Sequence, residues 1–391
     1  MKGTLIQRSE GSWSLVVALG RDPITRKKRQ KWHTFRGNKK QAQAELTRLI
    51  HQLNTGAYVE PTKLNVGDFL DRWLSDYAET NVSGKTLERY REIVSKHLKP
   101  SLGSLALHQL KPLHIQSYYT KALQSGRAKQ TEQRKGLSAQ TVLHHHRVLR
   151  EALNRAVKWQ LIYFNPADAV EPPKPARNEM RALSEAETAW LLEVGKGTRL
   201  YLPVLLAVTS GMRRGEFLAL QWQDIDLRTG IAIVRRSVEQ TNTGIRFKSP
   251  KGRKGRPIAL LPIAIAALKE HIETQGQHKQ TARGAYVDDG LVCAREDGSL
   301  WKPDTFTADF ARLAKKAGLR LRLHDLRHSH ATQLLVNGIH PKVVSERLGH
   351  STVGITLDIY SHVLPGLQDD AAKKLDVALR SAIEQRQAKT V

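Results

Sequence analysis

The segment that most constrains the fold is EPPKPARNEMRALS, residues 171–184, which is rich in proline and in charged residues. This composition is typical of a linker between domains. The chain has 391 residues and is too long for one ordinary core, so two or three domains are expected. We therefore predict a linker at 171–183, one set of domains before it and a separate domain at 184–363.

Residues 1–57 have the pattern of a small separate unit. They contain three short segments with strand character: TLIQRS, SWSLVVALG and RQKWHTF. In the second segment larger apolar residues alternate with smaller ones, at the period of a strand with one buried face: Trp13, Leu15, Val17 and Leu19. The segment NKKQAQAELTRLIHQLNTG then predicts a helix, with Asn38 as its N-cap and Gly56 as its stop. These patterns together predict a three-stranded sheet packed against one helix.

Residues 65–170 carry four apolar stripes at helical spacing, which favours a small all-α bundle. The run HHHR at 144–147 invites interpretation as a metal site. Consecutive histidines on a helix diverge by about 100° each, so three in a row cannot all bind one ion. We expect a solvated or DNA-facing helix turn there.

Residues 184–363 mix strands and helices. Strand-like segments lie at 231–238, 244–249 and 256–261, and helices dominate elsewhere, with Ser184 as the first N-cap. The tail, residues 364–391, has one apolar stripe at helical spacing: Leu367, Ala371, Leu375, Leu379 and Ile383. The predicted tail helix packs either on its own domain or on a neighbouring protomer.

Composition narrows the class of partner. Lysine and arginine number 63 against 37 acidic residues, which gives a net charge of +26 and a pI near 10.2. This charge favours a polyanion, nucleic acid first; a merely basic soluble protein, a ribosomal protein or a membrane-surface binder are the plainer alternatives. The 40% hydrophobic content and seven tryptophans are enough for true cores.

Other features argue against membrane and disulfide-rich classes. No stretch approaches the roughly 20 apolar residues that span a bilayer. The start, MKGTLIQRSEG, lacks the apolar region of a signal peptide. Cys293 is the single cysteine, which excludes disulfides within the chain and cysteine-cluster zinc sites. We expect a cytoplasmic protein with no membrane partner.

The segment LHDLRHSHATQLLVNGIHPKVVSERLGHSTVGITLDIYSHV, residues 323–363, carries the strongest chemical signal. His324 and Arg327 stand three apart, so on a helix they share one face and can reach one phosphate. His350 and Tyr360 follow, and TSGMRRGEFLAL upstream supplies a second arginine. Arginine is permanently charged and makes paired hydrogen bonds to phosphate oxygens. Together these side chains are suited to attack on a phosphodiester without a metal ion.

These motifs resemble the tyrosine recombinases, the phage integrase family, over roughly residues 65–363. The family pattern G-x-R-x-x-E matches Gly211, Arg213 and Glu216, with Arg214 as a rival for Arg213. The resemblance implies that Arg213 and Arg327 are the catalytic arginines and that Glu216 is a positioning group. The ten-residue step from the LGH histidine to the LDIY tyrosine is similar to that of temperate-phage and conjugative-transposon integrases.

The resemblance also assigns the remaining roles. It implies that Tyr360 is the nucleophile and that His324 and His350 are phosphate donors or proton shuttles. The segment KSPKGRKGRPIAL offers three lysines for protonating the leaving oxygen. Lys251 fits the family hairpin best; Lys248 and Lys254 are then expected to grip DNA. The other nearby histidines are expected to be structural or DNA-adjacent: His328, His330 and His362.

The N-terminal unit resembles the arm-binding domains that precede the core in many integrases. Arg29, Lys31 and His33 alternate onto one face of the third strand, and strands can enter a major groove. We predict that this face contacts DNA. Residues 65–170 resemble the helical (SAM-like) core-binding domain of the family. The expected fold is therefore a β-sheet plus helix domain, an all-α domain and a mainly helical α+β catalytic domain.

The family resemblance implies an integrase of a phage or mobile element. Such an enzyme cuts and rejoins double-stranded DNA through a 3′-phosphotyrosine and a Holliday junction, as a homotetramer, without a cofactor or ATP. A host bending factor and an excision factor are further expected partners, in the nucleoid of a bacterial cell. Two other classes remain open at this stage: a type IB topoisomerase, and a DNA-binding protein with a decayed active site.

Overall fold

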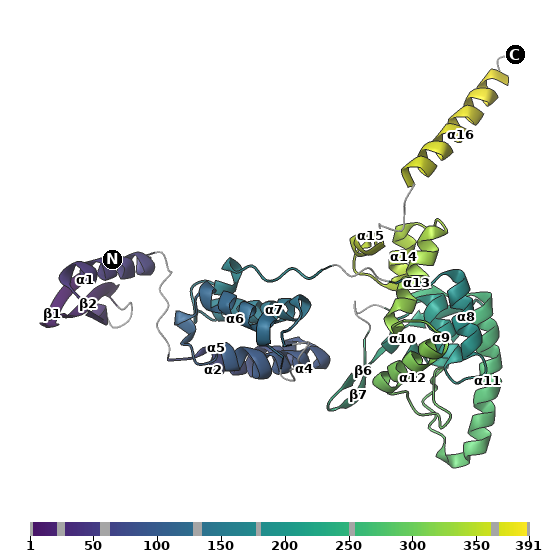
Figure 1. Ribbon diagram of the computed structural model, residues 1–391, viewed down its shortest axis with the longest axis horizontal. Helices are drawn as coiled ribbons and strands as arrows, with labels where there is room; N and C mark the ends of the chain where they lie inside the picture. The colour runs from purple at the N-terminus through teal and green to yellow at the C-terminus, as the bar shows by residue number, and fades with distance from the viewer. Residues whose placement is uncertain are drawn as a thin grey trace. The chain divides into compact units, whose positions relative to one another are not determined.

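The computed structural model describes residues 3–21, 28–54, 63–127, 135–176, 181–249, 255–360 and 367–388 (Figure 1). The chain divides into two units, residues 1–177 and 178–391. The first unit contains two separate hydrophobic cores, one in the N-terminal sheet and helix and one in the helical region.

The N-terminal sheet consists of β1 (Gly3–Ser9), β2 (Ser12–Arg21) and β3 (Lys28–Arg36) in antiparallel order, and α1 (Lys39–Asn54) packs on one face. The Asn38 side chain accepts a hydrogen bond from the Gln41 N–H over 2.9 Å, and the Gln41 side chain accepts from the Asn38 N–H over 3.1 Å. The expected sheet, helix and N-cap are confirmed. The expected stop at Gly56 lies outside the described residues.

The register of this sheet corrects the predicted DNA face. Lys31 pairs with Val17 and His33 pairs with Leu15, and directly paired residues share one face. Val17 and Leu15 are buried against α1, so Lys31 and His33 point toward the helix. The open face is the opposite one, where Trp32 is 52% exposed. Nothing is described of the Arg29 side chain.

The helical region has one continuous core. Its α-helices are α2 (Val66–Trp73), α3 (Glu79–Asn81), α4 (Gly84–Ile93), α5 (Lys99–Leu102), α6 (Pro112–Ser125) and α7 (Ala139–Lys158). The π-helical turns η1 (Leu74–Ala78) and η2 (Val94–Leu98) join α2 to α3 and α4 to α5, and the 3-10 turns are η3 (Leu107–Gln109) and η4 (Pro166–Ala169). Each π turn keeps its helix continuous, so the first two predicted stripes form two long, slightly re-phased helices.

The HHHR run on α7 contradicts the expectation of a solvated or DNA-facing turn. His145 and His146 are buried, and their Nδ1 atoms hydrogen-bond the hydroxyls of Tyr118 and Tyr119 on α6 over 2.7 and 2.8 Å. Only His144 of the three is exposed. The two buried imidazoles satisfy two core phenols, which would otherwise be buried without partners.

The second unit opens with α8 (Glu185–Gly195), whose N-cap Ser184 accepts from the Glu187 N–H over 3.1 Å, as expected. The next elements are α9 (Tyr201–Ser210), α10 (Arg214–Leu218), η5 (Trp222–Asp224), β4 (Ile225–Asp226), β5 (Ile231–Val234), β6 (Ser237–Thr241), β7 (Gly244–Lys248) and β8 (Arg256–Ala259). Strands β4, β5 and β8 form one antiparallel sheet, and β6 and β7 form a hairpin. The predicted strand at 231–238 is therefore two strands in two sheets.

Helices complete the second unit. They are α11 (Pro262–Ala282), the 3-10 turn η6 (Arg283–Ala285), α12 (Pro303–Lys316), α13 (Leu323–Val336), α14 (Pro341–Leu348), α15 (Val353–Tyr360) and α16 (Leu367–Ala388). Helix α13 packs on α9 and α14, and α14 packs on α15 and β8 (Figure 1). These contacts gather segments from residues 211–216, 324–330 and 348–360 in one place. No helix within the described ranges is long and apolar enough to cross a membrane.

Candidate active site

Helix α13 places His324 and Arg327 on the same side, one turn apart. The helix begins at a capping box, in which Asp325 accepts hydrogen bonds from the backbone N–H (2.8 Å) and the guanidinium of Arg322. His324 is exposed, whereas Arg327 is 4% exposed. The helix therefore buries a permanent charge, which requires several partners.

Two arginines from distant segments meet at one carbonyl oxygen. Arg327 donates from Nη2 to the Leu348 carbonyl over 2.7 Å and from Nη1 to the Gly211 carbonyl over 2.6 Å. Arg213 donates from Nη1 to the Leu348 carbonyl over 3.4 Å and from Nη2 to the Gly349 carbonyl over 3.1 Å. Burial, followed by the charge of Arg213, lowers the pKa of Arg327 to about 9. The two guanidiniums bring two positive charges together, and one carboxylate, Glu216, pairs with Arg213. The remaining positive charge suits a bound phosphate.

The buried carboxylate of Glu216 supports this pair. It accepts hydrogen bonds from the Arg213 backbone N–H (2.9 Å) and guanidinium (3.0 Å). It also accepts two bonds from Arg256 on β8, over 3.0 and 2.6 Å. Burial raises the pKa of Glu216, but the hydrogen bonds and charge of Arg256, followed by those of Arg213, outweigh burial and leave the pKa below its ordinary value. Glu216 therefore stays ionised and orients Arg213.

Two glycines are required by this geometry. Gly211 ends α9 in the left-handed region with φ +65°, and a Cβ there would come within 2.6 Å of the His330 ring. Gly349 ends α14 with φ +66°, and its Cβ would come within 2.9 Å of the Arg256 guanidinium. Their carbonyls are acceptors for Arg327 and Arg213. The glycines of GMRRGE and LGH thus present the oxygens that hold both arginines.

His350 follows Gly349 and lies beside the arginine pair. Its Nδ1 hydrogen-bonds the hydroxyl of Thr356, which is buried on α15, over 2.8 Å. Burial, followed by the charges of Arg327 and Arg213, lowers the pKa of His350 to about 4. His324 is exposed at one side, but the protein atoms on its other side desolvate it and lower its pKa, with Arg327 the next cause. Both imidazoles are neutral at pH 7 and can each donate one N–H.

Tyr360 ends α15 and is 2% exposed. Its hydroxyl lies 2.7 Å from Nδ1 of His328 on α13. Burial raises the pKa of Tyr360 to about 12, although the charge of Arg327 opposes this shift. The phenol is therefore protonated in the free protein and must lose its proton before or during any attack.

Five predicted site residues meet in this way: Arg213, His324, Arg327, His350 and Tyr360. Arg214 does not join them. It donates to the Pro303 carbonyl over 3.0 Å and to the Thr307 hydroxyl over 2.7 Å, and it pairs with Asp304. Its partners belong to α12, so the rival assignment of the first arginine to Arg214 finds no support in the geometry.

The other predicted residues lie elsewhere or outside the described ranges. Lys248 ends β7 and pairs with Glu239 on β6. Lys251, Lys254 and His362 lie outside the described residues. His330 is buried on α13, where it accepts a hydrogen bond from Arg347 over 2.9 Å and bonds the Val208 carbonyl through Nδ1, which supports a structural role.

Three further residues lie at the site: Arg256 and Thr356, which the sequence did not single out, and His328, which was expected to be structural or DNA-adjacent. Arg256 stands in the segment KSPKGRKGRPIAL, five residues after Lys251, and the resemblance of this segment to the family hairpin could have indicated it. Thr356 bonds His350, which stands six residues before it, and His328 bonds Tyr360, which stands 32 residues after it. The contact between His328 and Tyr360 depends on helix packing and not on local spacing.

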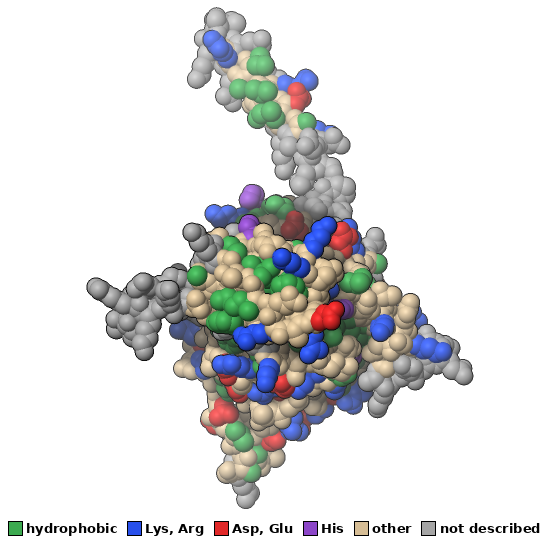
Figure 2. All heavy atoms as spheres, turned by 90° about the vertical axis from the view of Figure 1, so that its left-hand side faces the viewer, with side chains coloured by type: hydrophobic (Ala, Val, Ile, Leu, Met, Phe, Trp, Pro, Cys, Tyr) green, Lys and Arg blue, Asp and Glu red, His purple; other side chains and the backbone are tan. Residues whose placement is uncertain are grey.

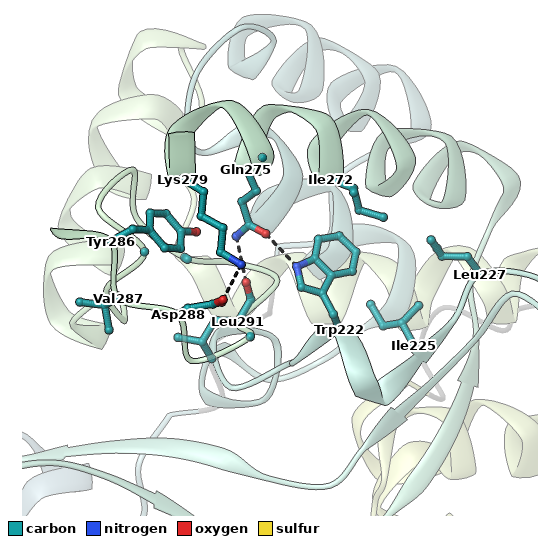
Figure 3. A pocket seen from close by; sticks show the side chains of 14 residues that line it. Trp222, Ile225, Leu227, Ile272, Gln275, Lys279, Tyr286, Val287, Asp288 and Leu291 are labelled. Atoms are coloured by element: carbon teal, nitrogen blue, oxygen red, sulfur yellow. Dashed lines mark hydrogen bonds and ion pairs between the residues drawn. The ribbon is translucent and has the colours of Figure 1, made fainter. Parts of the chain in front are cut away.

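A cavity of about 460 Å³ lies away from this cluster, between α11, η5 and the loop that carries Tyr286 and Leu291 (Figure 3). In it, Trp222 donates to the Gln275 side chain over 2.7 Å, and Gln275 donates to the Leu291 carbonyl over 2.9 Å. Lys279 pairs with Asp288 at the rim. None of the predicted site residues lines this cavity. Across the described ranges no group of three or more His, Cys, Asp or Glu residues is arranged to hold a metal ion.

Comparison with known proteins identifies the class. Residues 177–366 match the phage integrase family, and residues 65–123 match the phage integrase N-terminal SAM-like domain. The XerC-like tyrosine recombinase of Caldanaerobacter subterraneus is 27% identical over 96% of this chain and 98% of its own length. Prophage integrase IntR of Escherichia coli is 26% identical over 86% of this chain and 85% of its own.

Solved structures share the fold. The Tn1549 transposon integrase in complex with transposon right end DNA aligns with a TM-score of 0.67 and 21% identity, over 80% of this chain and 100% of that chain. A lambda integrase tetramer bound to a Holliday junction aligns with a TM-score of 0.54 and 20% identity, over 89% and 95%. The chain belongs to the phage integrase family, the tyrosine recombinases, and is an enzyme that cuts and rejoins DNA in site-specific recombination. The multidomain fold class predicted from the sequence is confirmed.

Proposed function

We propose that this enzyme integrates and excises a phage or mobile element by using Tyr360 as its nucleophile, with a 3′-phosphotyrosine and a Holliday junction as intermediates. The convergence of Arg213 and Arg327 on the Leu348 carbonyl carries this proposal. It brings two positive charges close together, and the charge of Arg327 acts to lower the pKa of Tyr360. A phosphodiester bound there would lie between its electrostatic stabilisers and its nucleophile.

Each neighbouring side chain has a role in this proposal. Arg213 and Arg327 bind the non-bridging oxygens and stabilise the charge that grows on them during transfer. His324 and His350 donate neutral N–H groups to the same oxygens. Glu216 orients Arg213 through the hydrogen bonds described above. These residues supply the electrostatics of phosphoryl transfer from the protein itself.

Lys251 is the proposed general acid that protonates the leaving 5′-oxygen. An alkoxide leaves poorly, so a proton donor is needed on that side of the phosphorus. Arg256 supports the assignment, because it follows Lys251 by five residues in the sequence and bonds Glu216 at the site. Lys248 and Lys254 are proposed to bind DNA.

The N-terminal domain is proposed to bind arm-type DNA through the open face of its sheet. Arg8 lies 5.7 Å from the centre of the Trp32 ring and donates to the Ser14 hydroxyl over 3.0 Å. This arrangement presents an aromatic ring and a cation on a strand surface that α1 does not cover. Figure 2 shows Lys and Arg side chains spread over the visible face, among fewer acidic ones, in accord with a polyanionic partner.

The assembly is proposed to be a homotetramer on two DNA duplexes. Helix α16 supports a protein contact, because Leu375, Leu379 and Ile383 lie on one stripe and are 62, 55 and 55% exposed. An amphipathic helix with an exposed apolar stripe is stabilised by docking on another surface, here proposed to be a neighbouring protomer. A host factor that bends DNA and an excision factor are proposed to bring the arm-type DNA sites to the core-type site. The proposed location is the nucleoid of a bacterial host.

A plasmid carrying two attachment sites tests the function. Wild-type protein is expected to recombine the sites, and Tyr360→Phe is expected to abolish recombination while DNA binding persists. Deletion of residues 1–57 should spare cleavage of a core site and abolish integration at arm-bearing sites. Full integration by the truncated protein would contradict the arm-binding role. Relaxation of a plasmid that lacks any attachment site would instead support a topoisomerase.

A further inference from the structure

His328 stands in the segment HDLRHSH but is not one of the residues that the family pattern assigns to the reaction. It lies on α13 one turn after His324, and the two rings meet edge to face with centroids 4.9 Å apart. It is 8% exposed. Its Nδ1 is 2.7 Å from the hydroxyl of Tyr360. Among the described residues, this hydroxyl has no other hydrogen-bond partner. The reacting atom of the proposed nucleophile is therefore bonded to an imidazole.

The chemistry of the phenol calls for such a partner. Tyr360 has a raised pKa of about 12, so its proton does not leave spontaneously at neutral pH. Arg213 and Arg327 cannot accept a proton, because a guanidinium has no free lone pair. A neutral imidazole with its proton on Nε2 presents Nδ1 as an acceptor, and the phenol O–H then donates to it. Burial, with the neighbouring His324 next, lowers the pKa of His328 to about 4, so the ring is neutral at pH 7.

We propose that His328 is a catalytic residue, the base that accepts the Tyr360 proton as the phenolic oxygen attacks the phosphate. In that step the Oη–P bond forms and the P–O5′ bond breaks. The phenolic proton moves to Nδ1 of His328, and the leaving 5′-oxygen takes a proton from Lys251. His328 thus becomes a cation as Lys251 becomes neutral, and rejoining reverses both transfers. This inference rests on the proposed role of Tyr360.

The surroundings of His328 disfavour a charge on the ring in the free protein, and a bound phosphodiester would weaken that effect. Titratable and charged groups face it from every neighbouring element: Arg322, His324, Asp325 and Arg327 at α13, His350 after α14, and Tyr360 on α15. Asp325 is the one among them that raises the pKa of His328, while the arginines lower it. Arrival of a phosphodiester between the arginines would offset their positive charge. The imidazolium form then becomes more accessible when substrate is bound.

The test uses single-turnover cleavage of nicked DNA with a normal 5′-oxygen or a sulfur in its place at the scissile bond. A thiolate leaves without protonation, so the sulfur substrate does not require a general acid. It still requires a base that accepts the proton of the nucleophile. Asparagine at 328 puts an amide close to the position of Nδ1, which keeps a hydrogen bond but cannot take a proton. His328→Asn is therefore compared with Lys251→Ala, and melting and DNA binding of both are checked against wild type.

His328→Asn is expected to cleave the oxygen substrate about 100-fold more slowly than wild type at pH 7. The sulfur substrate should rescue Lys251→Ala and leave His328→Asn slow. The rate of His328→Asn should rise about tenfold per pH unit between about pH 6 and 9, because hydroxide must then remove the proton, whereas wild type should vary less. His328→Gln serves as the second variant where the asparagine variant does not match the wild-type melting temperature.

Three outcomes would overturn the assignment. Wild-type cleavage by His328→Asn would make the contact a packing hydrogen bond, and faster cleavage would make it a brake on the nucleophile. Rescue of His328→Asn by sulfur would move its role to the leaving group. Covalent capture by Tyr360→Phe would instead overturn the proposed nucleophile, which is a separate failure.

Discussion

Arg213 and Arg327 donate hydrogen bonds to the same acceptor, the carbonyl oxygen of Leu348, over 3.4 and 2.7 Å. Two like charges in a poorly hydrated site repel each other, which is why the Arg213 charge helps to lower the pKa of Arg327 to about 9. Backbone carbonyls and one carboxylate hold the pair in place. A phosphodiester bound beside the two guanidiniums would offset their repulsion.

Replacement of Arg327 by lysine should abolish most of the activity. A lysine ammonium cannot contact the Gly211 and Leu348 carbonyls and still present a fork to phosphate. We expect Arg327→Lys to lower the single-turnover cleavage rate by about 100-fold or more, with little change in DNA affinity. Arg320→Lys, an exposed neighbour in the same domain, is the matched control. A near-normal cleavage rate for Arg327→Lys would contradict the bidentate role.

Replacement of Glu216 by glutamine should destabilise the domain. The buried carboxylate pairs with Arg213 and Arg256, and a neutral amide leaves two partly buried cations without their anion. Breaking such a buried pair costs about 3 kcal/mol or more. Urea unfolding of Glu216→Gln should show this loss, and the exposed Glu193→Gln control should not. Equal stability of the two variants would mean that Glu216 does not hold the arginines.

The same residue predicts how stability depends on pH. The folded pKa of Glu216 lies below its ordinary value of 4.5. A carboxyl group whose folded pKa is depressed stabilises the protein fully above the unfolded pKa and loses this contribution as pH falls through the folded pKa. Between pH 7 and pH 3 the wild type should therefore lose more stability than Glu216→Gln. Parallel melting curves across that range would exclude this linkage.

Alanine at Gly349 should affect both folding and cleavage. The residue has φ +66°, and a Cβ would press on the Arg256 guanidinium, which Glu216 and the Arg347 carbonyl hold in place. Gly338 also has a positive φ, +77°, but open space around it. We expect Gly338→Ala to cost about 1 kcal/mol of strain with normal cleavage, and Gly349→Ala to cost more and to cleave about tenfold more slowly. Identical behaviour of the two variants would show that the clash with Arg256 has no consequence.

DNA binding should weaken steeply with salt. The net charge of +26 implies many phosphate contacts, and each contact releases counterions on binding. We expect the dissociation constant to rise about 1,000-fold or more between about 50 and 200 mM salt. Titration of labelled attachment-site DNA by fluorescence anisotropy measures this slope. A flat response would contradict the use of net charge as evidence for phosphate contacts.

The sequence predicted the parts of the site that depend on local spacing. The three-residue step between His324 and Arg327 fixes one helix face, and the G-x-R-x-x-E resemblance implied that Glu216 positions Arg213. The contact between His328 and Tyr360 was not predictable in this way. It joins two helices that are linked through α14, and only the packing of α14 and α15 on α13 sets the distance.

Alternation along β3 predicted that Lys31 and His33 share a face, but not which face is open. A strand has two faces, and the position of α1 decides which one is covered. The pKa of Glu45 on α1 is lowered first by a hydrogen bond from Arg48 and to a smaller extent by His33, which places His33 on the helix side. The buried histidines of α7 were mispredicted for a similar reason, because their phenol partners lie on α6.

The central claim is that Tyr360 forms the covalent bond to DNA. Nicked suicide DNA carrying the attachment core, on which the broken strand diffuses away, traps that bond. Wild-type protein should give a covalent complex that resists denaturant, with the nucleotide adduct on the peptide containing Tyr360, and Tyr360→Phe should give none. A covalent complex that persists in Tyr360→Phe, or an adduct on another residue, would contradict the account.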